Sequence, residues 1–565
     1  PAQSVEELAT ATGLPRPIAS IMINRGMDSA EAIERFLEPS LDMLEDPFSL
    51  KGMESGVERV CEALRRNERI TIYGDYDVDG ITATSLLYLA LNKLGAQVSF
   101  YLPNRLVEGY GLSIEGIDKA AEEGSSLIVT VDTGITAGEE IEYARSKGIE
   151  VIVTDHHEAG DRLPKAVAIV NPKQPGCSYT GGELSGVGVA FKFAQGLYQR
   201  LGQRAEDLYE HLDLVALGTS ADIVPLVNEN RVLTKFGIRE IARTAKPGLK
   251  SLVFVSGLIG KELNANHVIF VLAPRINAIG RLGDASMAIR LLTTRDDRLA
   301  SEVAHQLEAE NKRRKAIDEK TLNEALEQIE EKINDDDSAI VLASEGWHQG
   351  VIGIVASRLV ERRHVPTVMI AIDNGVGKGS ARSIPGFHLC EALKECEDLL
   401  LRYGGHKYAA GLSIEPKNIP EFAERFKQVS SRKLDDDALA PKLHVDYELE
   451  LEQIDNHLLD TLERFEPYGP KNLRPLFLTR NCEICREPSL VGRNHLRMRV
   501  RKGNSSFDVI GFGLGDFVQP LRNNGSLVDL VYVAEYNEWN GVKRMQLQLK
   551  DIRFSSGSLN SGYII

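Results

Sequence analysis

Acidic and histidine side chains follow four short apolar runs in the first half of the chain. The runs are RITIYG (69–74), LIVTV (127–131), VIVT (151–154) and LVALGTSA (214–221). The residues that follow them are Asp75, Asp77, Asp79, Asp132, Asp155, His156, His157 and Asp222. In open parallel sheets, ligands bind beyond the carboxyl ends of the strands. If all four runs are strands of one such sheet, these side chains gather at one edge.

The spacing of Asp77 and Asp79 favours a metal site. In an extended chain, residues two apart point to the same side, so both carboxylates would face one point. Gly80 then allows a tight turn into a helix that starts with ITATSLLYLA. Several carboxylates this close raise one another's pKa unless a cation compensates them. Carboxylates with a few imidazoles suit Mn²⁺ or Mg²⁺, and the number of ligands predicts two ions, roughly 3.5–4 Å apart, sharing one carboxylate.

Each of these residues also has an ordinary structural explanation. A single Asp after a strand is most often a helix N-cap or a turn former. Six or more such positions after four successive runs are much harder to explain in that way. We therefore interpret the set as a metal centre.

The surrounding pattern predicts the elements that hold this centre. Apolar β-branched runs alternate with helical stretches from about residue 57, which is typical of a parallel sheet with helices on both faces. The segment 294–333 has no Gly or Pro and predicts a long, solvated helix between two domains. AIVLA, TVMIAI and AAGLSI predict strands of a second α/β unit, with helices starting near Gly350 and His388. After about residue 443 the pattern alternates with period two, which predicts an antiparallel barrel.

These patterns divide the chain into five parts. Ser29 is predicted to cap a helix in a small N-terminal helical appendage. The predicted parts are the appendage (1–45), a first α/β domain (46–290), a long connecting helix (291–336), a second α/β domain (337–434) and a β-barrel (435–565).

Composition indicates in which cellular environment the protein is expected. The chain has 565 residues, is 43% hydrophobic and 26% charged, and has no apolar run long enough for a membrane helix. The start, PAQSVEELATATGL, has no basic or apolar segment, so no secretory signal is predicted, and because it lacks Met we expect a processed or truncated end. Six cysteines suit a reducing cytoplasm. Cys482 and Cys485 form a C-x-x-C, for which a pair of ordinary thiols is favoured over a zinc site because no second pair follows.

The net charge of −16 means that any nucleic-acid contact must come from local basic sites. Residues 471–553 contain 14 Lys and Arg against 8 Asp and Glu, a local balance of +6. Arg497, Arg499 and Arg501 alternate on one predicted strand, so they share a face. Phe507, Phe512, Tyr532, Tyr536 and Trp539 either stack on bases or fill the barrel core. The basic face is typical of an OB-fold that binds a single strand.

Several motifs carry a family resemblance. GDYDVDG (74–80), VTVDTG (129–134), TDHH (154–157) and ALGTSADIVPL (216–226) resemble the motifs of the DHH phosphoesterase superfamily. The chain is more closely similar to the RecJ family of bacterial single-strand exonucleases within it. The motifs that carry this closer likeness are PNRLVEGYGLS (103–113), SGVGVAFK (185–192), LAPRINAIGRL (272–282), WHQGVIGIVASRL (347–359), KGSARS (378–383) and GGHKYAAGLS (404–413). The resemblance covers residues from about 20 to 480, and the last region resembles the family's OB-fold more weakly.

The resemblance implies a DHH domain, a DHH-associated substrate-binding domain and an OB-fold nucleic-acid-binding domain. It also implies roles for the acidic cluster. Asp77, Asp79, Asp132, His156 and Asp222 would be metal ligands, with Asp132 bridging the ions. His157 would be a catalytic or orienting group. Asp75 and Asp155 would orient ligands, although Asp75 could also reach a metal directly.

Further residues are implied to contact the DNA. Arg275, Asn277 and Arg281 are predicted in a short loop that binds backbone phosphates. Ser380 and Arg382, expected just after a strand, and His406 would form part of the substrate site of the second α/β domain, with the substrate between the two α/β domains. Arg105 would contact a phosphate, Tyr110 would stack on the terminal nucleotide, and Arg497, Arg499 and Arg501 would contact the strand.

The activity implied is 5′–3′ hydrolysis of single-stranded DNA to 5′-mononucleotides with Mn²⁺ or Mg²⁺, in recombination and repair. The family implies a single-strand-binding protein and a RecQ-type helicase as partners, and we expect a cytoplasmic monomer without membrane contact. Two alternatives remain. A nanoRNA or cyclic-dinucleotide phosphodiesterase would be shorter and lack the barrel, and a catalytically inactive scaffold, like the relative in eukaryotic replication helicases, would have lost ligands. In PYGPKNLRPLF (467–477), Lys471 and Leu473 depart from the family pattern.

Overall fold

A computed structural model describes residues 2–104, 108–109, 111–282, 284–334, 337–524, 527–539, 542–555 and 563–564. The chain forms two compact units. The first contains Pro1–Val253, Leu258–Ala273 and Lys442–Ile565, and the second contains Phe254–Gly257 and Pro274–Pro441. Among the described residues, no helix is both long and apolar enough to cross a membrane.

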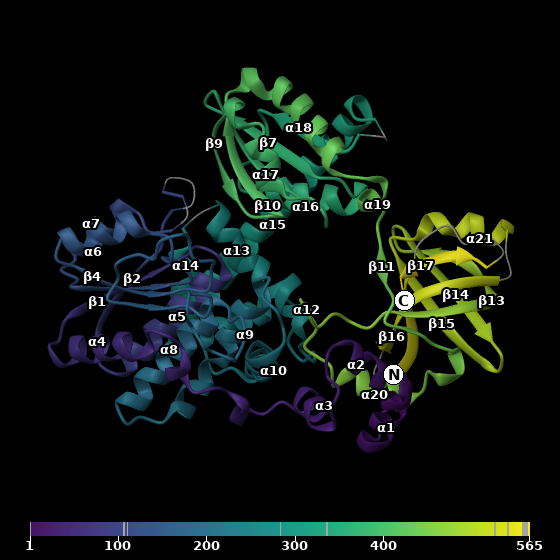
Figure 1. Ribbon diagram of the computed structural model, residues 1–565, viewed down its shortest axis with the longest axis horizontal. Helices are drawn as coiled ribbons and strands as arrows, with labels where there is room; N and C mark the ends of the chain where they lie inside the picture. Colours follow the sequence, from purple (N-terminus) through teal and green to yellow (C-terminus); the bar gives the residue numbers. More distant parts are fainter. Residues whose placement is uncertain are drawn as a thin grey trace. The chain divides into compact units, whose positions relative to one another are not determined.

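The first unit contains a parallel sheet of order β2-β1-β3-β4-β5 (Figure 1). Its central strands are buried on both faces, which explains why their sequences are continuous apolar runs. The strands are β1 (Arg69–Gly74), β2 (Gln97–Tyr101), β3 (Leu127–Val131), β4 (Glu150–Thr154) and β5 (Ala168–Val170). The helices around them are α4 (Met53–Arg65), α5 (Val78–Lys93), α6 (Ile114–Glu122), α7 (Gly138–Ser146) and α8 (Gly186–Arg200). The predicted α/β fold is confirmed here.

One of the four predicted strands is wrong. LVALGTSA lies in helix α9 (Leu212–Ala221), which packs against α5 and α10 (Asn228–Arg243). Residues Leu214 to Ser220 are all buried, and this part of the helix carries apolar or small residues on every side. A fully buried helix and a buried strand have the same apolar signature over eight residues. Further helices of this region are α11 (Pro247–Val255), α12 (Ala265–His267) and the π-helix η4 (Val268–Leu272).

The second unit contains a mixed sheet of order β6-β7-β8-β10-β9. The helix predicted over 294–333 is α15 (Asp297–Lys332), and Leu322, Ala325 and Ile329 of its second half pack into a core with α16. The strands are β6 (Ile340–Ser344), β7 (Thr367–Asp373), β8 (Val376–Arg382), β9 (Leu400–Gly405) and β10 (Ala409–Ile414). The helices are α13 (Ala273–Leu282), α14 (Ser286–Thr293), α16 (Ile352–Arg363), α17 (Leu389–Lys394), α18 (Ile419–Lys433) and α19 (Asp436–Leu439). The helix starts predicted near Gly350 and His388 are correct, and His388 caps α17.

The last part of the chain is the predicted barrel. Strands β13, β14, β15, β17 and β16 pair in this order, and β13 also pairs with β16, which closes the barrel. The strands are β13 (Phe477–Val491), β14 (His495–Lys502), β15 (Ser505–Phe512), β16 (Leu527–Trp539) and β17 (Val542–Phe554). The shorter elements are β11 (Leu443–His444), β12 (Tyr447–Glu448), α20 (Asn456–Glu463), α21 (Val518–Asn524) and β18 (Tyr563–Ile564). Period-two alternation predicted all the long strands except β13.

The N-terminal helices share a hydrophobic core with this barrel. Leu14, Ile18 and Met22 belong to one buried cluster with Phe477 and Leu496 of the barrel strands. Helices α1 (Ala2–Thr12) and α2 (Arg16–Asn24) lie beside the barrel and α20 (Figure 1). Helix α3 (Ala30–Leu37) follows, and the predicted Ser29 cap accepts a hydrogen bond from Ala32 N. The first and last parts of the chain therefore stabilise each other.

Candidate metal centre and DNA-binding residues

Asp77 and Asp79 lie at the start of helix α5, not in an extended segment. Asp77 is the N-cap, and its Oδ1 accepts hydrogen bonds from Asp79 N (2.9 Å) and Gly80 N (3.1 Å). Asp79 is already in the first helical turn. The prediction that both side chains project from extended chain is therefore wrong, because the helix begins two residues before Gly80. The capping role and the metal-ligand role proposed for Asp77 are compatible, since a carboxylate has several acceptor positions.

The N-terminus of helix α8 holds the Asp79 carboxylate. Asp79 Oδ2 accepts from Gly186 N at 2.6 Å, and Oδ1 accepts from Val187 N at 2.8 Å. Free N–H groups and the helix dipole make this end a favourable place for a negative charge. Two segments more than 100 residues apart in the chain therefore fix one acidic side chain.

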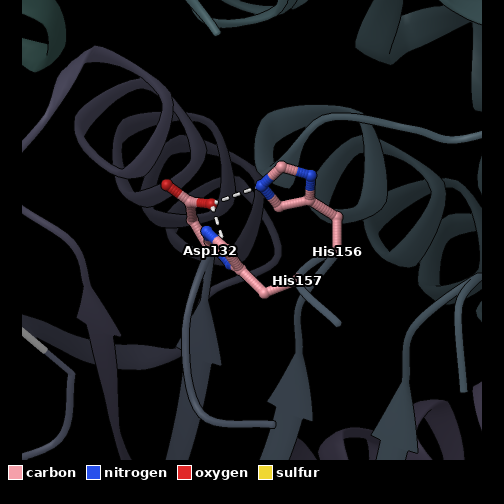
Figure 2. Close-up of side chains that lie close together, drawn as sticks. All are labelled: Asp132, His156 and His157. Atoms are coloured by element: carbon pink, nitrogen blue, oxygen red, sulfur yellow. Dashed lines mark ion pairs between the residues drawn. The ribbon is translucent and has the colours of Figure 1, made fainter. Parts of the chain in front are cut away.

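Asp132 lies at the middle of the candidate centre. It follows β3, has a φ of 61° and is 2% exposed. Its Oδ1 lies 3.0 Å from His156 Nε2 and 4.0 Å from His157 Nδ1 (Figure 2). A non-glycine residue with this φ is strained by about 1–3 kcal/mol and is held by its surroundings. The backbone therefore aims this carboxylate at the two imidazoles at an energetic cost.

Asp222 reaches the same place from the end of a helix. It is the C-cap of α9, so the prediction of a fourth strand end is corrected here. Asp222 Oδ1 accepts from Ile223 N at 2.9 Å, while Oδ2 lies 3.6 Å from His156 Nε2. His156 Nε2 is also 3.9 Å from Asp79 Oδ2. One imidazole nitrogen therefore faces three carboxylates.

Asp155 points away from this group and orients His157. Asp155 Oδ1 lies 2.8 Å from His157 Nδ1 and accepts from His156 N at 2.7 Å, while Oδ2 accepts from Ile135 N at 2.9 Å. Burial alone would raise the pKa of Asp155, but the hydrogen bond from His157 and the charge of that ring hold it below its usual value. The same pair outweighs burial at His157 and raises its pKa.

Ligand atoms of this cluster form three sets in which every atom lies within 4.8 Å of the others. The sets are Asp132 with His156 and His157, Asp79 with His156 and Asp222, and Asp75 with Asp77 and Asp132. Asp132 and His156 each belong to two sets. Asp75 is 3% exposed, and one of its carboxylate oxygens lies within 4.8 Å of carboxylate oxygens of Asp77 and Asp132.

The electrostatics of the cluster favour a bound cation. Burial, followed by the neighbouring charges of Asp222 and Asp77, raises the pKa of Asp79 well above its usual value. Burial and the charges of Asp79 and Asp77 do the same for Asp132. Burial lowers the pKa of His156, which favours the neutral imidazole that binds metals. Hard oxygen donors with one or two imidazoles, crowded and destabilised as anions, fit divalent Mn²⁺ or Mg²⁺.

Three glycines surround the centre and were not predicted as part of it. A Cβ at Gly186 would lie 2.5 Å from Asp132, one at Gly218 would lie 2.8 Å from Asp79 Oδ1, and one at Gly80 would lie 2.6 Å from Asp75 O. None of the three has a positive φ, so these positions require glycine because of close packing and not because of backbone conformation. Glycines next to acidic motifs were the available signal, but only the fold shows that Gly186 and Gly218 make room for carboxylates and Gly80 for the backbone of Asp75.

Several predicted DNA-binding residues are now placed. Arg105 and Tyr110 lie outside the described residues. Arg275, Asn277 and Arg281 lie in helix α13 and not in the predicted loop. Pro274 and Gly280 suggested a loop, but a Pro in the first turn of a helix is compatible with it, and the helix includes Gly280. Arg275 is 8% exposed and pairs with Glu308 at 2.6 Å, which reduces its availability to a phosphate.

Ser380 and Arg382 lie on strand β8, not after it. Arg382 Nη1 donates to Ser380 Oγ at 3.1 Å. A Cβ at Gly353 would lie 2.8 Å from Ser380 Oγ and 3.0 Å from Arg382 Nη2, so both side chains lie against the start of helix α16. His406 follows β9 and is exposed.

The predicted basic face of the barrel is present on β14. Arg497 and Arg501 are exposed and Arg499 is half-buried, while Met498 and Val500 between them are buried. Arg501 Nη2 pairs with Glu483 at 2.8 Å and Arg499 lies 3.7 Å from Asp508, so Arg497 is the member for which the described residues offer no carboxylate.

The other features noted near the barrel are divided between its core and its surface. Tyr532 is fully buried, whereas Phe512 is 56% exposed. Cys482 is buried in the core, where burial raises its pKa to about 12, and Cys485 is exposed. Two thiols in such different surroundings do not form a shared metal site.

Comparisons with known proteins agree with this arrangement. Residues 69–219 match the model of the DHH family N-terminal domain, residues 336–432 match the DHHA1 domain, and residues 445–551 match the RecJ OB domain. A relative from Bacillus subtilis, the single-stranded-DNA-specific exonuclease RecJ, is 41% identical over 546 residues, which cover 96% of this chain and 68% of the relative. The chain belongs to the RecJ family. The RecJ of Escherichia coli is 37% identical over 560 residues, covering 95% of this chain and 96% of that protein.

Solved structures of the RecJ family share the whole fold. RecJ from Thermus thermophilus in complex with Mn²⁺ has a TM-score of 0.84 and 34% identity, covering all of this chain and 80% of that one. The complex of the same protein with Mg²⁺ has a TM-score of 0.78 and 32% identity, covering 98% of this chain and 77% of that one. The predicted resemblance and the predicted fold class are both confirmed.

Proposed function

We propose that this chain is a metal-dependent 5′–3′ exonuclease that degrades single-stranded DNA to 5′-mononucleotides in recombination and repair. The observation that carries the proposal is the cluster of Asp75, Asp77, Asp79, Asp132 and Asp222 around two imidazoles, in a chain of the RecJ family. Membership of the RecJ family supports single-stranded DNA as the substrate and the 5′–3′ polarity. The acidic cluster supports metal-dependent hydrolysis.

The proposed roles follow from the contacts of each residue. Asp77, Asp79, His156 and Asp222 would hold two Mn²⁺ or Mg²⁺ ions, and Asp132, which belongs to two of the three ligand sets, is the residue placed to serve both. Bound divalent ions lower the pKa of water and stabilise negative charge on the phosphate. Asp75 is a ligand or orients one.

His157 is the proposed proton carrier of the centre. Asp155 fixes its ring through Nδ1 and so sets the direction of the other ring nitrogen, Nε2. A second imidazole that is fixed in this way can donate or accept a proton without moving.

The proposed DNA contacts are Ser380, Arg382 and His406 of the second unit and Arg497, Arg499 and Arg501 of the barrel. Arg105, Tyr110, Arg275, Asn277 and Arg281 remain predictions. Single-strand-binding protein and a RecQ-type helicase are proposed partners, and a cytoplasmic monomer is the proposed state. The barrel argues against a nanoRNA or cyclic-dinucleotide phosphodiesterase, and the filled acidic positions argue against an inactive scaffold.

The test compares wild type with Asp132→Ala on end-labelled single-stranded and duplex DNA with Mn²⁺ or Mg²⁺. We expect wild type to degrade the single strand, and the variant to lose at least about 100-fold in rate because the shared carboxylate is gone. Mn²⁺ binding, measured by calorimetry, should weaken in parallel. Asp161→Ala, an exposed position, is the matched control. If wild type leaves single strands intact, or Asp132→Ala degrades them as fast, the proposed function is wrong.

A further inference from the structure

The last strand of the parallel sheet also ends beside the metal centre. Strand β5 pairs with β4 so that Val170 lies opposite Thr154, and Asp155 N donates to Val170 O at 3.0 Å. The residue that follows β5 is Asn171, which is fully buried. Since the carboxyl ends of parallel strands meet at one edge of a sheet, Asn171 lies at the same edge as the residues that follow β4.

Both ends of the Asn171 amide have a partner. Nδ2 donates to His157 O at 3.0 Å, and Oδ1 accepts from Lys173 N at 2.8 Å. A carbonyl oxygen cannot donate and a backbone N–H cannot accept, so these two partners decide which end of the amide faces which. The side chain therefore connects the segment after β5 with His157, the proposed proton carrier.

The segment after β5 is a fixed turn. Gln174 N donates to Asn171 O at 3.2 Å, and Gln174 Nε2 donates to Ile169 O at 2.7 Å and to Lys51 O at 3.1 Å. Asn in the first position and Pro172 in the second are typical of such a turn, because proline fixes φ and the Asn oxygen accepts from the backbone two residues on. Turn formation explains the bond to Oδ1, but it makes no use of Nδ2.

His157 is held from three directions. Asp155 Oδ1 accepts from His157 N at 3.2 Å and lies 2.8 Å from the ring Nδ1, and Asn171 Nδ2 donates to the His157 carbonyl. The direction of an imidazole depends on the position of its own backbone as well as on the bond to its ring. A misplacement of about 1 Å can slow a reaction about 10²-fold. The carbonyl bond is therefore one of the contacts that decide where the imidazole lies.

We propose that Asn171 is a positioning residue for His157. Its Nδ2 transmits the rigidity of the turn after β5 to the backbone of His157, and so keeps the imidazole where it can transfer a proton. Asn171 acts through His157 and needs no contact with the substrate. The inference rests on the proposed function and adds the end of β5 to the strand ends that build the centre.

The first test measures kcat, KM and Mn²⁺ affinity of Asn171→Ala and Asn171→Ser on a labelled single strand. Both variants should lose about 10- to 100-fold in kcat. KM and Mn²⁺ affinity should stay within about 2-fold of wild type, because the ligand residues keep their places. Serine can still accept from Lys173 N and keep the turn, but it is too short to reach His157 O. A loss in Asn171→Ser therefore reports the missing bond to His157 and not the loss of the turn.

The second test repeats Asn171→Ala in a His157→Gln background under single-turnover conditions. With no imidazole to position, the additional loss should be less than about 2-fold. Asn472→Ala is the matched control, since Asn472 is also fully buried and its Nδ2 donates to Phe465 O at 2.9 Å and to Pro467 O at 2.8 Å, away from the centre. It should lower the midpoint of thermal unfolding and leave kcat unchanged.

Three results would overturn the inference while wild type degrades single strands. They are an unchanged kcat in Asn171→Ala, a full wild-type kcat in Asn171→Ser, and an equal loss from Asn171→Ala with and without His157. Thermal unfolding of every variant shows whether a loss of rate follows a loss of fold. If wild type itself leaves single strands intact, the proposed function is wrong.

Discussion

Several acidic residues in and beside the centre have a local task in the fold. Asp77 caps α5, Asp222 ends α9, and Asp155 bonds to three backbone N–H groups and one imidazole. The ordinary explanation of a lone Asp is therefore correct for Asp77, and it does not exclude the metal centre. Residue type and order predicted that these side chains lie close together, and the structure brings them together. Their roles could not be read from local sequence.

The close packing of Gly186 against Asp132 leads to a testable prediction. Gly186→Ala would place a Cβ 2.5 Å from Asp132, so either α8 or the carboxylate must move. Since Asp132 belongs to two ligand sets, we expect Mn²⁺ affinity and exonuclease rate to fall at least about 10-fold, with the fold intact. Calorimetry with Mn²⁺ and the rate on a labelled single strand measure the two effects.

The control for this substitution is Gly138→Ala. Gly138 also begins a helix of the same domain, α7, but a Cβ there would meet nothing within 4 Å. It should leave metal affinity and rate unchanged. Equal behaviour of the two variants would show that the contact with Asp132 is unimportant.

Sequence patterns correctly predicted the helices and strands in which burial follows a regular pattern. The strands before Asp75, Asp132 and Asp155 are continuous apolar runs, and the long helix α15 has no Gly or Pro. Three elements were misassigned. α9 is buried on all sides, α13 contains Pro274 and Gly280, and β13 changes register twice in its pairing with β14, which disrupts its alternation. Local patterns fail where tertiary packing, and not periodicity, decides the conformation.

The segment before the barrel gives a prediction about one turn. Lys471 has a φ of 57°, a conformation that costs a non-glycine residue about 1–2 kcal/mol. Glycine removes this strain but gains freedom in the unfolded chain, so Lys471→Gly should raise the free energy of unfolding by up to about 1 kcal/mol. Chemical denaturation measures the change.

Lys471→Ala separates this effect from loss of the lysine side chain. Its exposed contact with Glu183 spans 3.4 Å and contributes little. Alanine removes the contact and keeps the strain, so its stability should equal or fall below that of wild type. Greater stability of Lys471→Ala than of Lys471→Gly would refute the strain argument.

At the scale of the molecule, the two ends of the chain form one structure. The N-terminal helices and the barrel share a core, and Asn472 accepts a hydrogen bond from Arg25 Nη1 at 2.8 Å. Sequence patterns predicted helices in the first 45 residues and a barrel in the last part, but not their association. Contacts between residues more than 440 positions apart leave no periodic signal in either segment.

Arg231 of α10 connects this structure to the parallel-sheet domain. It is 2% exposed and donates to the carbonyls of Phe36 at 3.1 Å, Arg464 at 2.8 Å and Phe465, and its guanidinium lies 4.1 Å from the Phe36 ring centroid. Burial lowers its pKa to about 10, so it stays charged at neutral pH. One side chain therefore joins the parallel-sheet domain, helix α3 and the segment that leads into the barrel.

Arg231→Met should therefore destabilise the first unit as a whole. Methionine fills similar space but removes the donor to Phe36 O, and it leaves Arg464 O to Lys235 Nζ and Phe465 O to Asn472 Nδ2, which costs about 1–3 kcal/mol. We expect the midpoint of chemical denaturation to fall for both the sheet domain and the barrel, with hydrogen exchange of peptides from β1–β5 and from β13–β17 reporting the same transition. Arg231→Lys keeps the charge but reaches fewer carbonyls, so its loss should be intermediate. Arg239→Met, on the same helix and exposed, is the control. If Arg231→Met lowers the stability of only one part, the three segments do not unfold together.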